Sequence, residues 1–192
     1  MAIKFQYNKT SLQQLEKQLK IRVRTLPIIK NKESALRLEV KRCKTEAVEL
    51  EEKQIQAYEA MFALWNEFDA SLIKVKDVHL GVRKIAGVRV PLLEDVDFDV
   101  RPFSLFCSPK WYADGIHLLK NLARTAIERE FTLAKLSLLE HARKKTTQKV
   151  NLFEKVQIPG YQDALRKIKR FMEDEENLSK SSQKILRLKY DC

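Results

Sequence analysis

Apolar residues recur at alternating steps of three and four along the first third of the chain. Counted from Leu12 to Phe68, fourteen of the seventeen positions reached by these steps are apolar. This is the a/d spacing of a coiled coil, sustained over about eight heptads, and a strict seven-residue period predicts a left-handed supercoil. The predicted seam is Leu12, Leu15, Leu19, Arg22, Leu26, Ile29, Glu33, Leu36, Val40, Cys43, Ala47, Leu50, Gln54, Ala57, Met61, Leu64 and Phe68.

Helix breakers are concentrated in the middle of the chain. Residues 28–80 and 116–158 contain neither glycine nor proline, whereas Gly81, Gly87 and Gly115 lie between these two stretches. We therefore expect a second helical rod after Pro109 and Gly115. Its predicted seam is Leu119, Leu122, Ala126, Leu133, Leu136, Val150, Phe153, Val156, Tyr161, Ala164, Ile168, Phe171, Leu178 and Ile185.

Prolines set the expected irregularities of both rods. Pro27 removes a helical hydrogen bond and predicts a kink or a late helix start, although Asn8 or Thr10 can serve as the N-cap of a helix that begins earlier. Pro159 and Gly160 are expected to bend or break the second rod.

The segment between the rods has strand spacing. Val88, Val90 and Leu92 alternate with other residues, as do Val96, Phe98 and Val100, which predicts a short hairpin-like unit. The expected fold is mainly α: a long antiparallel two-helix coiled coil with a β-hairpin in its middle segment. We assign residues 1–74 to the N-terminal helix, 75–110 to the middle segment and 111–192 to the C-terminal helix, with both termini at one end.

The net charge of +11 is unevenly distributed along the 192 residues. Residues 1–50 carry 12 basic and 5 acidic groups, residues 51–108 carry 7 and 10, and residues 109–192 carry 18 and 11. Both ends of the chain are therefore basic, which favours an acidic partner, either protein or nucleic acid. Cys43, Cys107 and Cys192 are odd in number and far apart, which is typical of free thiols in a reducing cytosol.

No residues suggest catalysis, cofactor binding or a metal site. His79, His117 and His141 are isolated from one another and lack neighbours at zinc-ligand spacing. The acidic run at 94–99 lacks the glycine and terminal glutamate of an EF-hand. Its alternation of acidic and apolar residues suits a strand with one solvent-exposed face. The basic run Arg143-Lys144-Lys145 is either a solvated helix face or a place where another chain binds.

Four motifs in order resemble the D subunit of the V-type and A-type ATPases. The stretch at 150–159, V-N-L-F-E-K-V-Q-I-P, resembles the signature V-N-A-L-E-x-V-x-I-P of that family, and G-V-R-V-P at 87–91 resembles its G-V-x-V-P. The leucines from Leu12 with I-I-K-N-K at 28–32, and the closing L-R-L-K at 186–189, resemble its opening and its tail. The departures from the family pattern are N-K-T at 8–10, Pro27, Glu33-Ser34 and Asn177.

The resemblance implies a non-catalytic rotor shaft without cofactors. Its implied partners are the catalytic and non-catalytic head subunits (A and B), the F subunit of the stalk and the subunit that caps the membrane ring (C or d), with no nucleic acid and no membrane insertion. The implied location is the cytoplasmic face of the membrane, where the complex couples ion translocation to ATP synthesis or hydrolysis. We expect the partner-binding residues to be Lys180, Lys184, Arg187, Lys189, Arg143, Lys144, Lys145, Val150 and Phe153.

Two other functions fit parts of the pattern. The basic charge alone also fits a coiled-coil protein that binds nucleic acid, but its basic faces lack the interleaved aromatic residues that stack on bases. A free-standing coiled-coil adaptor fits the periodicity alone. The order of the four motifs favours the rotary ATPase component over both.

Overall fold

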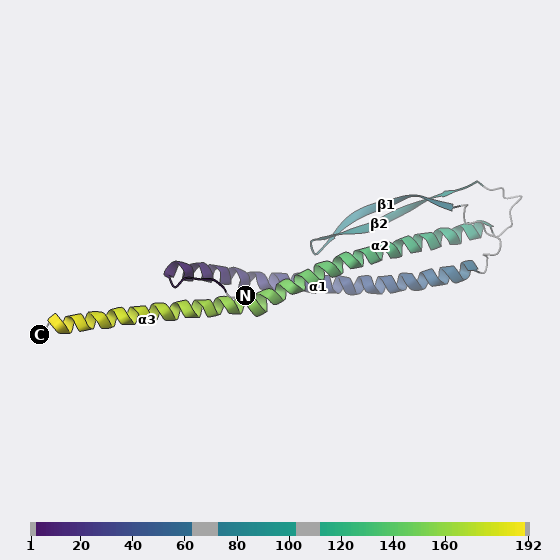
Figure 1. Ribbon diagram of the computed structural model, residues 1–192. Coiled ribbons are helices and arrows are strands. Elements are labelled where there is room, and N and C mark those ends of the chain that lie inside the picture. Colours follow the sequence, from purple (N-terminus) through teal and green to yellow (C-terminus); the bar gives the residue numbers. More distant parts are fainter. Residues whose placement is uncertain (1–2, 63–72, 103–111, 191–192) are drawn as a thin grey trace. The chain divides into compact units, whose positions relative to one another are not determined.

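The computed structural model describes residues 3–62, 73–102 and 112–190, and these form mainly helices. Helix α1 spans Lys9–Phe62, strand β1 Ile73–Ile85, strand β2 Val88–Val100 and helix α2 Tyr112–Asn151 (Figure 1). A π-helical segment, η3, spans Leu152–Gln157 and leads directly into helix α3, Ile158–Tyr190. Two long helical regions and a central hairpin confirm the predicted fold class. The chain divides into two compact units, residues 1–33 with 145–192 (unit 1) and residues 34–144 (unit 2).

Helix α1 begins at the position that its capping residue predicts. The Asn8 side-chain oxygen accepts a hydrogen bond of 2.7 Å from the Ser11 N–H, which satisfies one of the free donors of the first turn. Pro27 lies inside the helix, so the expectation of a late start was wrong. The Pro27 ring is exposed and the residues on both sides of it remain helical.

The heptad seam predicted for this helix is confirmed. All described seam positions from Leu12 to Met61 are buried or half-buried, and Leu36 and Cys43 are completely buried. The exposed apolar residues Ile21, Ile28 and Leu38 all lie off the seam. Leu64 and Phe68, the last two seam positions, lie outside the described residues.

The first rod ends earlier than its sequence predicted. The stretch free of glycine and proline extends to Leu80, but residues from Ile73 onward form strand β1, and the described part of helix α1 extends to Phe62. This strand pairs antiparallel with β2 in a two-stranded sheet. The hairpin is confirmed, and all of 88–100 is its second strand. Pro91 therefore does not interrupt the strand, because it lies in a hairpin without a further neighbour.

A two-residue turn closes the hairpin. Ala86 and Gly87 have φ values of 47° and 79°, and Ile85 pairs with Val88 on either side of them. Positive φ at both central residues is the requirement of a type I′ turn, whose twist matches that of the flanking strands. The pairing register shifts twice: it skips Lys76 of β1 between Val75 and Asp77, and Glu94 of β2 opposite His79 and Leu80. The shift at Lys76 weakens the period-two signal along β1, so the sequence did not reveal this strand.

In unit 2, residues 34–62 of α1, the hairpin and residues 112–144 of α2 share one core. Leu36, Val40 and Cys43 of α1 pack with Val90 of β2 and Leu139 of α2. Three ion pairs join the helices: Lys44 to Glu140 (2.9 Å), Glu46 to Lys135 (3.3 Å) and Glu51 to Arg129 (3.1 Å). As the residue numbers of these ion-pair partners increase along α1, those on α2 decrease. These two helix segments therefore run antiparallel.

Helix α2 departs from its predicted seam. Leu133, a predicted seam residue, is exposed, whereas Leu139 is completely buried. In unit 2 this helix is covered by α1 on one side and by the hairpin on another (Figure 1). Two neighbours bury a wider stripe than the a/d seam of a two-stranded coiled coil, so the 3.5-residue period does not describe this helix. Its start at Tyr112 also places Gly115 inside the helix instead of before it.

In unit 1, the first residues of the chain pack with α1 and α3. The core consists of Leu15 with Ala164, Leu165 and Ile168, and Glu16 pairs with Lys169 at 3.4 Å. Farther along α1, Lys30 pairs with Glu154 at 2.8 Å, so this pair of segments is also antiparallel. The N-terminal segment (Ile3, Phe5 and Tyr7) covers this core, and the Tyr7 ring lies 4.9 Å from that of Phe171.

The π-helical turn accounts for two departures from the predictions for residues 150–160: the helix does not break at Pro159, and Val156 leaves the seam. Pro159 lacks an N–H and its ring would clash with the carbonyl of Lys155 in a regular α-helix. The preceding turn is instead wider, and the Ile158 N–H donates to the carbonyl of Phe153, five residues back. The helix therefore continues through Pro159 without a break. The added residue also shifts the seam, so that Val156 is exposed and Gln157 is half-buried.

Candidate functional site

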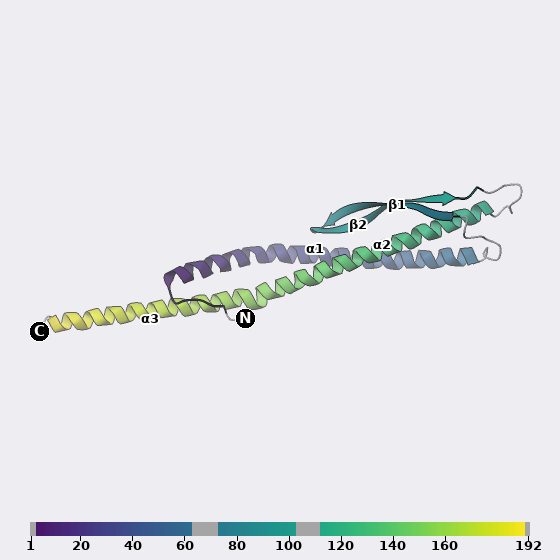
Figure 2. The same ribbon diagram turned by 45° about the horizontal axis from the view of Figure 1, so that its top comes forward.

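The C-terminal part of α3 is a long helix surface that no other described part of unit 1 covers. Every residue from 173 to 190 is exposed. Figures 1 and 2 both show this end of α3 extending beyond the start of α1 and the N-terminal segment. Leu178 and Leu188 keep 69% and 70% of their surface accessible. A helix of this length with exposed leucines is typical of a segment that another chain covers.

The basic and apolar residues of this helix end lie on opposite faces. At 100° per residue, Lys180, Lys184 and Arg187 fall on one ridge, and all three border a shallow hollow together with Ser181. Leu178 and Ile185 lie on the other side and continue the seam that is buried at Ala164 and Ile168. Lys189, which we predicted with the basic residues, lies on this apolar side.

Only one of the predicted basic residues is neutralised within this helix end. Lys180 forms an ion pair of 2.7 Å with Glu176, one turn earlier. The hydrogen bond from Lys180, together with its charge, lowers the pKa of the Glu176 carboxyl. Lys184, Arg187 and Lys189 form no ion pair with any described residue. The ridge therefore presents uncompensated positive charge to solvent.

The other predicted residues do not belong to this surface. Arg143 is half-buried and its Nε atom has no hydrogen-bond partner among the described residues, whereas Lys144 and Lys145 are exposed. Val150 and Phe153 are half-buried on the helical segment that precedes α3. Their binding role stays a prediction.

The sequence analysis did not predict a polar contact that fixes unit 1. Arg22, a charged residue at a seam position, donates from Nε to the Gln157 side-chain oxygen at 2.7 Å, and its guanidinium lies 4.5 Å from the centre of the Tyr161 ring. Gln157 reaches Arg22 because the π-helical turn brings it to the inner face. The N-terminal segment was also missed, although the alternation of Ile3, Phe5 and Tyr7 is visible in the sequence.

The hairpin carries a group of carboxylates around His79. His79 Nε2 lies 3.2 Å from a carboxylate oxygen of Asp97, and Asp77 and Asp95 are close enough to act on the same ring. The hydrogen bond and charge of Asp97 raise the pKa of His79. Among the described residues, no three carboxylate, histidine or cysteine side chains are arranged to hold a metal ion. No described helix is both long and apolar enough to cross a membrane.

We expect His79 to titrate above its ordinary pKa of 6.5 in the folded chain. Because the folded pKa is raised, protonated His79 stabilises the hairpin fully below pH 6.5, and this contribution is lost as the pH rises through the folded pKa. Asp97→Asn should lower the pKa toward the ordinary value. NMR titration of the ring, assigned with His79→Gln, measures both values. Equal pKa values in the wild type and Asp97→Asn would contradict this assignment.

The fold and its exposed surfaces define a class: a mainly helical, coiled-coil-like protein with a central hairpin and a long exposed helix end. The model of the family described as the D subunit of ATP synthase matches residues 11–187. The chain belongs to this family of ATP synthase D subunits.

Curated relatives support the same assignment over most of the chain. The V-type ATP synthase D subunit of Chlamydia pneumoniae is 30% identical over 183 residues, which cover 91% of this chain and 87% of the relative. The protein of the same name from Borreliella burgdorferi is 27% identical and covers 90% and 88%. The one from Chlamydia trachomatis serovar L2 is 32% identical and covers 78% and 77%.

Proposed function

We propose that this chain is the rotor shaft in the central stalk of a V-type ATP synthase. In this role it couples ion translocation in the membrane ring to ATP synthesis or hydrolysis in the catalytic head, without catalysing either step. The observation that carries the proposal is the exposed end of α3, residues 173–190. A basic ridge and an apolar seam lie there on one helix that no other described part of unit 1 covers. Family membership supports a place within the ATP synthase complex.

The helical architecture suits the transmission of torque. A shaft needs torsional stiffness, and long helices packed antiparallel with few breakers provide it. It must also be asymmetric, so that the surrounding catalytic sites differ at any moment. Helix α1 with its internal Pro27 and the α2–α3 region with its π-helical turn are unlike each other, which supplies that asymmetry.

We assign the exposed end of α3 and the rest of the chain to different partners. The exposed end of α3 lies within the ring of catalytic and non-catalytic head subunits (A and B). Its basic ridge binds acidic loops there, since attraction between charges is less directional than apolar packing and permits rotation. The F subunit of the stalk and the ring-cap protein bind elsewhere along the chain. The complex holds the shaft at the cytoplasmic face of the membrane, without nucleic acid and without insertion of this chain.

Neutralising the basic ridge together with Lys189 tests this assignment. The variant Lys180→Gln, Lys184→Gln, Arg187→Gln, Lys189→Gln should bind the isolated head subunits about thirtyfold more weakly, because four charge contacts of about 0.5 kcal/mol each are lost. Binding of the wild type should also depend more steeply on salt. Titration of labelled chain with purified head subunits at several salt concentrations measures both effects.

A second charge variant serves as the control. Lys41, Lys53, Lys74 and Lys76 are exposed residues of unit 2, and replacing them by glutamine removes the same four charges. This control should bind the head as the wild type does. If the α3 variant also retains full affinity and the same salt dependence, the ridge is not the head-binding surface.

A further inference from the structure

The outer face of the hairpin is a second exposed surface, separate from α3. Val90 and Val96 are buried, so alternate residues of β2 face the core of unit 2 and the intervening ones face outward. The cross-strand register pairs the outward residue Pro91 with Val82, and Leu93 with Leu80. Leu80 and Val82 keep 55% and 72% of their surface accessible and form the exposed part of an apolar patch in the middle of the outer face. Pro91 and Leu93 are half-buried and also border a hollow beside α1 and α2, so they form the edge of this patch.

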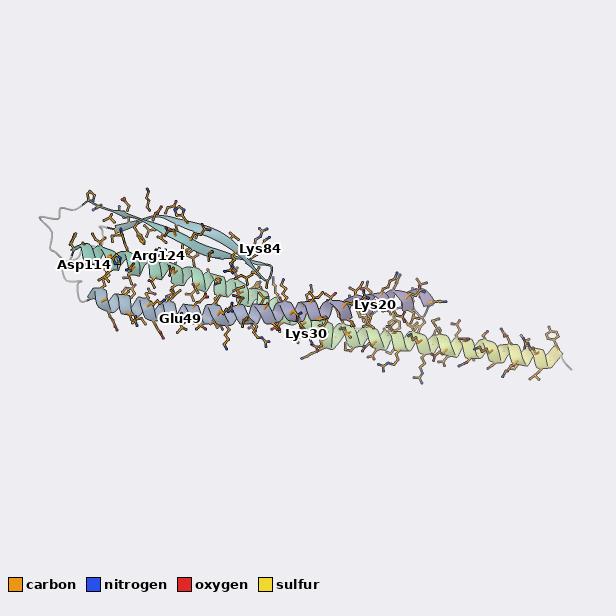
Figure 3. The ribbon with its side chains drawn as sticks, turned by 180° about the vertical axis from the view of Figure 1, so that it is seen from behind. Lys20, Lys30, Glu49, Lys84, Asp114 and Arg124 are labelled. Atoms are coloured by element: carbon orange, nitrogen blue, oxygen red, sulfur yellow. The ribbon has the colours of Figure 1, made fainter. Side chains whose placement is uncertain are left out.

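Opposite charges flank this patch at its two ends. The turn half of the hairpin, residues 80–93, contains three basic residues and no acidic one, for a charge of +3. Lys84 and Arg89 belong to the outer face, whereas Arg83 pairs with the buried Val90 and lies on the inner face. The open half, residues 73–79 with 94–100, contains two lysines and five carboxylates, for a charge of −3 with His79 neutral. Lys84 and Arg89 form one cross-strand pair near the turn, and Asp77 and Asp97 form another in the open half. Figure 3 shows Lys84 beside the turn.

This arrangement is self-complementary. A two-fold axis through the apolar patch places the basic half of one hairpin against the acidic half of another, and the two patches against each other. Interfaces of this kind use the same surface on both copies. The hairpin as a whole has no net charge, although the chain carries +11. The hairpin is thus a region where two copies of a strongly basic chain can approach each other.

We propose that the outer face of the hairpin binds a second copy of this chain, with the two hairpins antiparallel. The proposal concerns the free chain and does not depend on its role in the rotor. From the rise and spacing of the strands, the outward-facing charged and apolar cross-strand pairs would bury roughly 400 Å² of surface on each copy. This is about half of a standard interface, so the dimer is weak and reversible.

Complementary charge reversals test the pairing directly. Lys84→Glu with Arg89→Glu makes both halves of the hairpin negative, and Asp77→Lys with Asp97→Lys makes both halves positive. Each variant alone should dimerise at least about tenfold more weakly than the wild type, whereas an equimolar mixture should recover the dimer as a heterodimer. Asp95 is left unchanged because it pairs with Arg124 of α2 at 3.4 Å. Sedimentation velocity of the full chain, from roughly 10 µM to 1 mM, spans the range of a weak interface.

Charge reversal is more informative than salt dependence. Salt would screen both the attraction between hairpins and the repulsion between two basic chains, so its net effect has no clear sign. Two control variants separate the hairpin from other surfaces. Val82→Ser should weaken dimerisation, whereas Lys184→Glu with Arg187→Glu on α3 should not, although it changes the net charge as much as the hairpin reversal does. Circular dichroism verifies that each variant is folded.

Three results would contradict the proposal. The wild type could remain monomeric over the whole concentration range. The mixture of the two charge-reversed variants could fail to recover the dimer. Finally, the α3 variant could abolish a dimer that Val82→Ser leaves intact, which would assign self-association to the exposed seam of α3 instead.

Discussion

Replacing Leu139 by alanine is expected to lower the free energy of unfolding by about 2–5 kcal/mol. Leu139 is completely buried and packs with residues from α1 and the hairpin, so the substitution leaves a cavity among three elements. The surrounding helices and hairpin can close such a cavity only in part. Urea denaturation followed by circular dichroism at 222 nm measures the shift in the transition of the unit that contains this residue.

Leu138 provides a matched control on the preceding position of the same helix. It is exposed, so Leu138→Ala removes the same atoms from solvent and should change the free energy of unfolding by less than about 0.5 kcal/mol. Similar losses in the two variants would show that Leu139 does not occupy the core described for unit 2.

Placing charges on the exposed seam of α3 is expected to abolish assembly without loss of stability. Leu178→Asp with Ile185→Asp introduces two carboxylates at positions that are open to water in the free chain, so the thermal midpoint should not fall. If the head subunits cover this seam, each carboxylate loses its hydration there at a cost of several kcal/mol. Affinity for the isolated head should fall by roughly a hundredfold or more.

The corresponding control adds the same charges off the seam. Ser179 of α3 is exposed off the seam and Gln56 of α1 is exposed in unit 2, so Ser179→Asp with Gln56→Asp also adds two carboxylates. This control should bind at least about tenfold more tightly than the seam variant, by fluorescence anisotropy with labelled chain. Equal affinity of the two variants would mean that the seam has no special role in binding.

Helix α1 was predictable because its buried residues, including those that contact the hairpin, fall on one narrow stripe. Its seam needs only a narrow apolar stripe, and the 3.5-residue period from Leu12 to Met61 records that stripe. Helix α2 was less predictable, because the hairpin adds a second contact face and brings Leu139 into the core. The sequence did not reveal β1, because the register shift at Lys76 disturbs its alternation. A long-range pairing such as Ile73 with Val100 also leaves no local signal.

The binding role of the predicted residues stays a prediction, although three of them share one surface. Lys180, Lys184 and Arg187 lie on one exposed ridge, because their spacing of four and three residues is helical. The spacing rule failed for Val156, since it assumed a regular α-helix and the turn before Pro159 is π-helical. That turn could not be derived from the period of apolar residues, although the proline that favours it was visible.

The rotation of this chain within an active complex tests the rotor assignment most directly. The head subunits are fixed to a surface and a bead is attached to the chain through a tag on the hairpin turn at Ala86–Gly87. The account predicts stepwise rotation of the bead, in one direction, that stops when ATP is removed. A bead that stays still while the same complex hydrolyses ATP would contradict the assignment of this chain as the shaft.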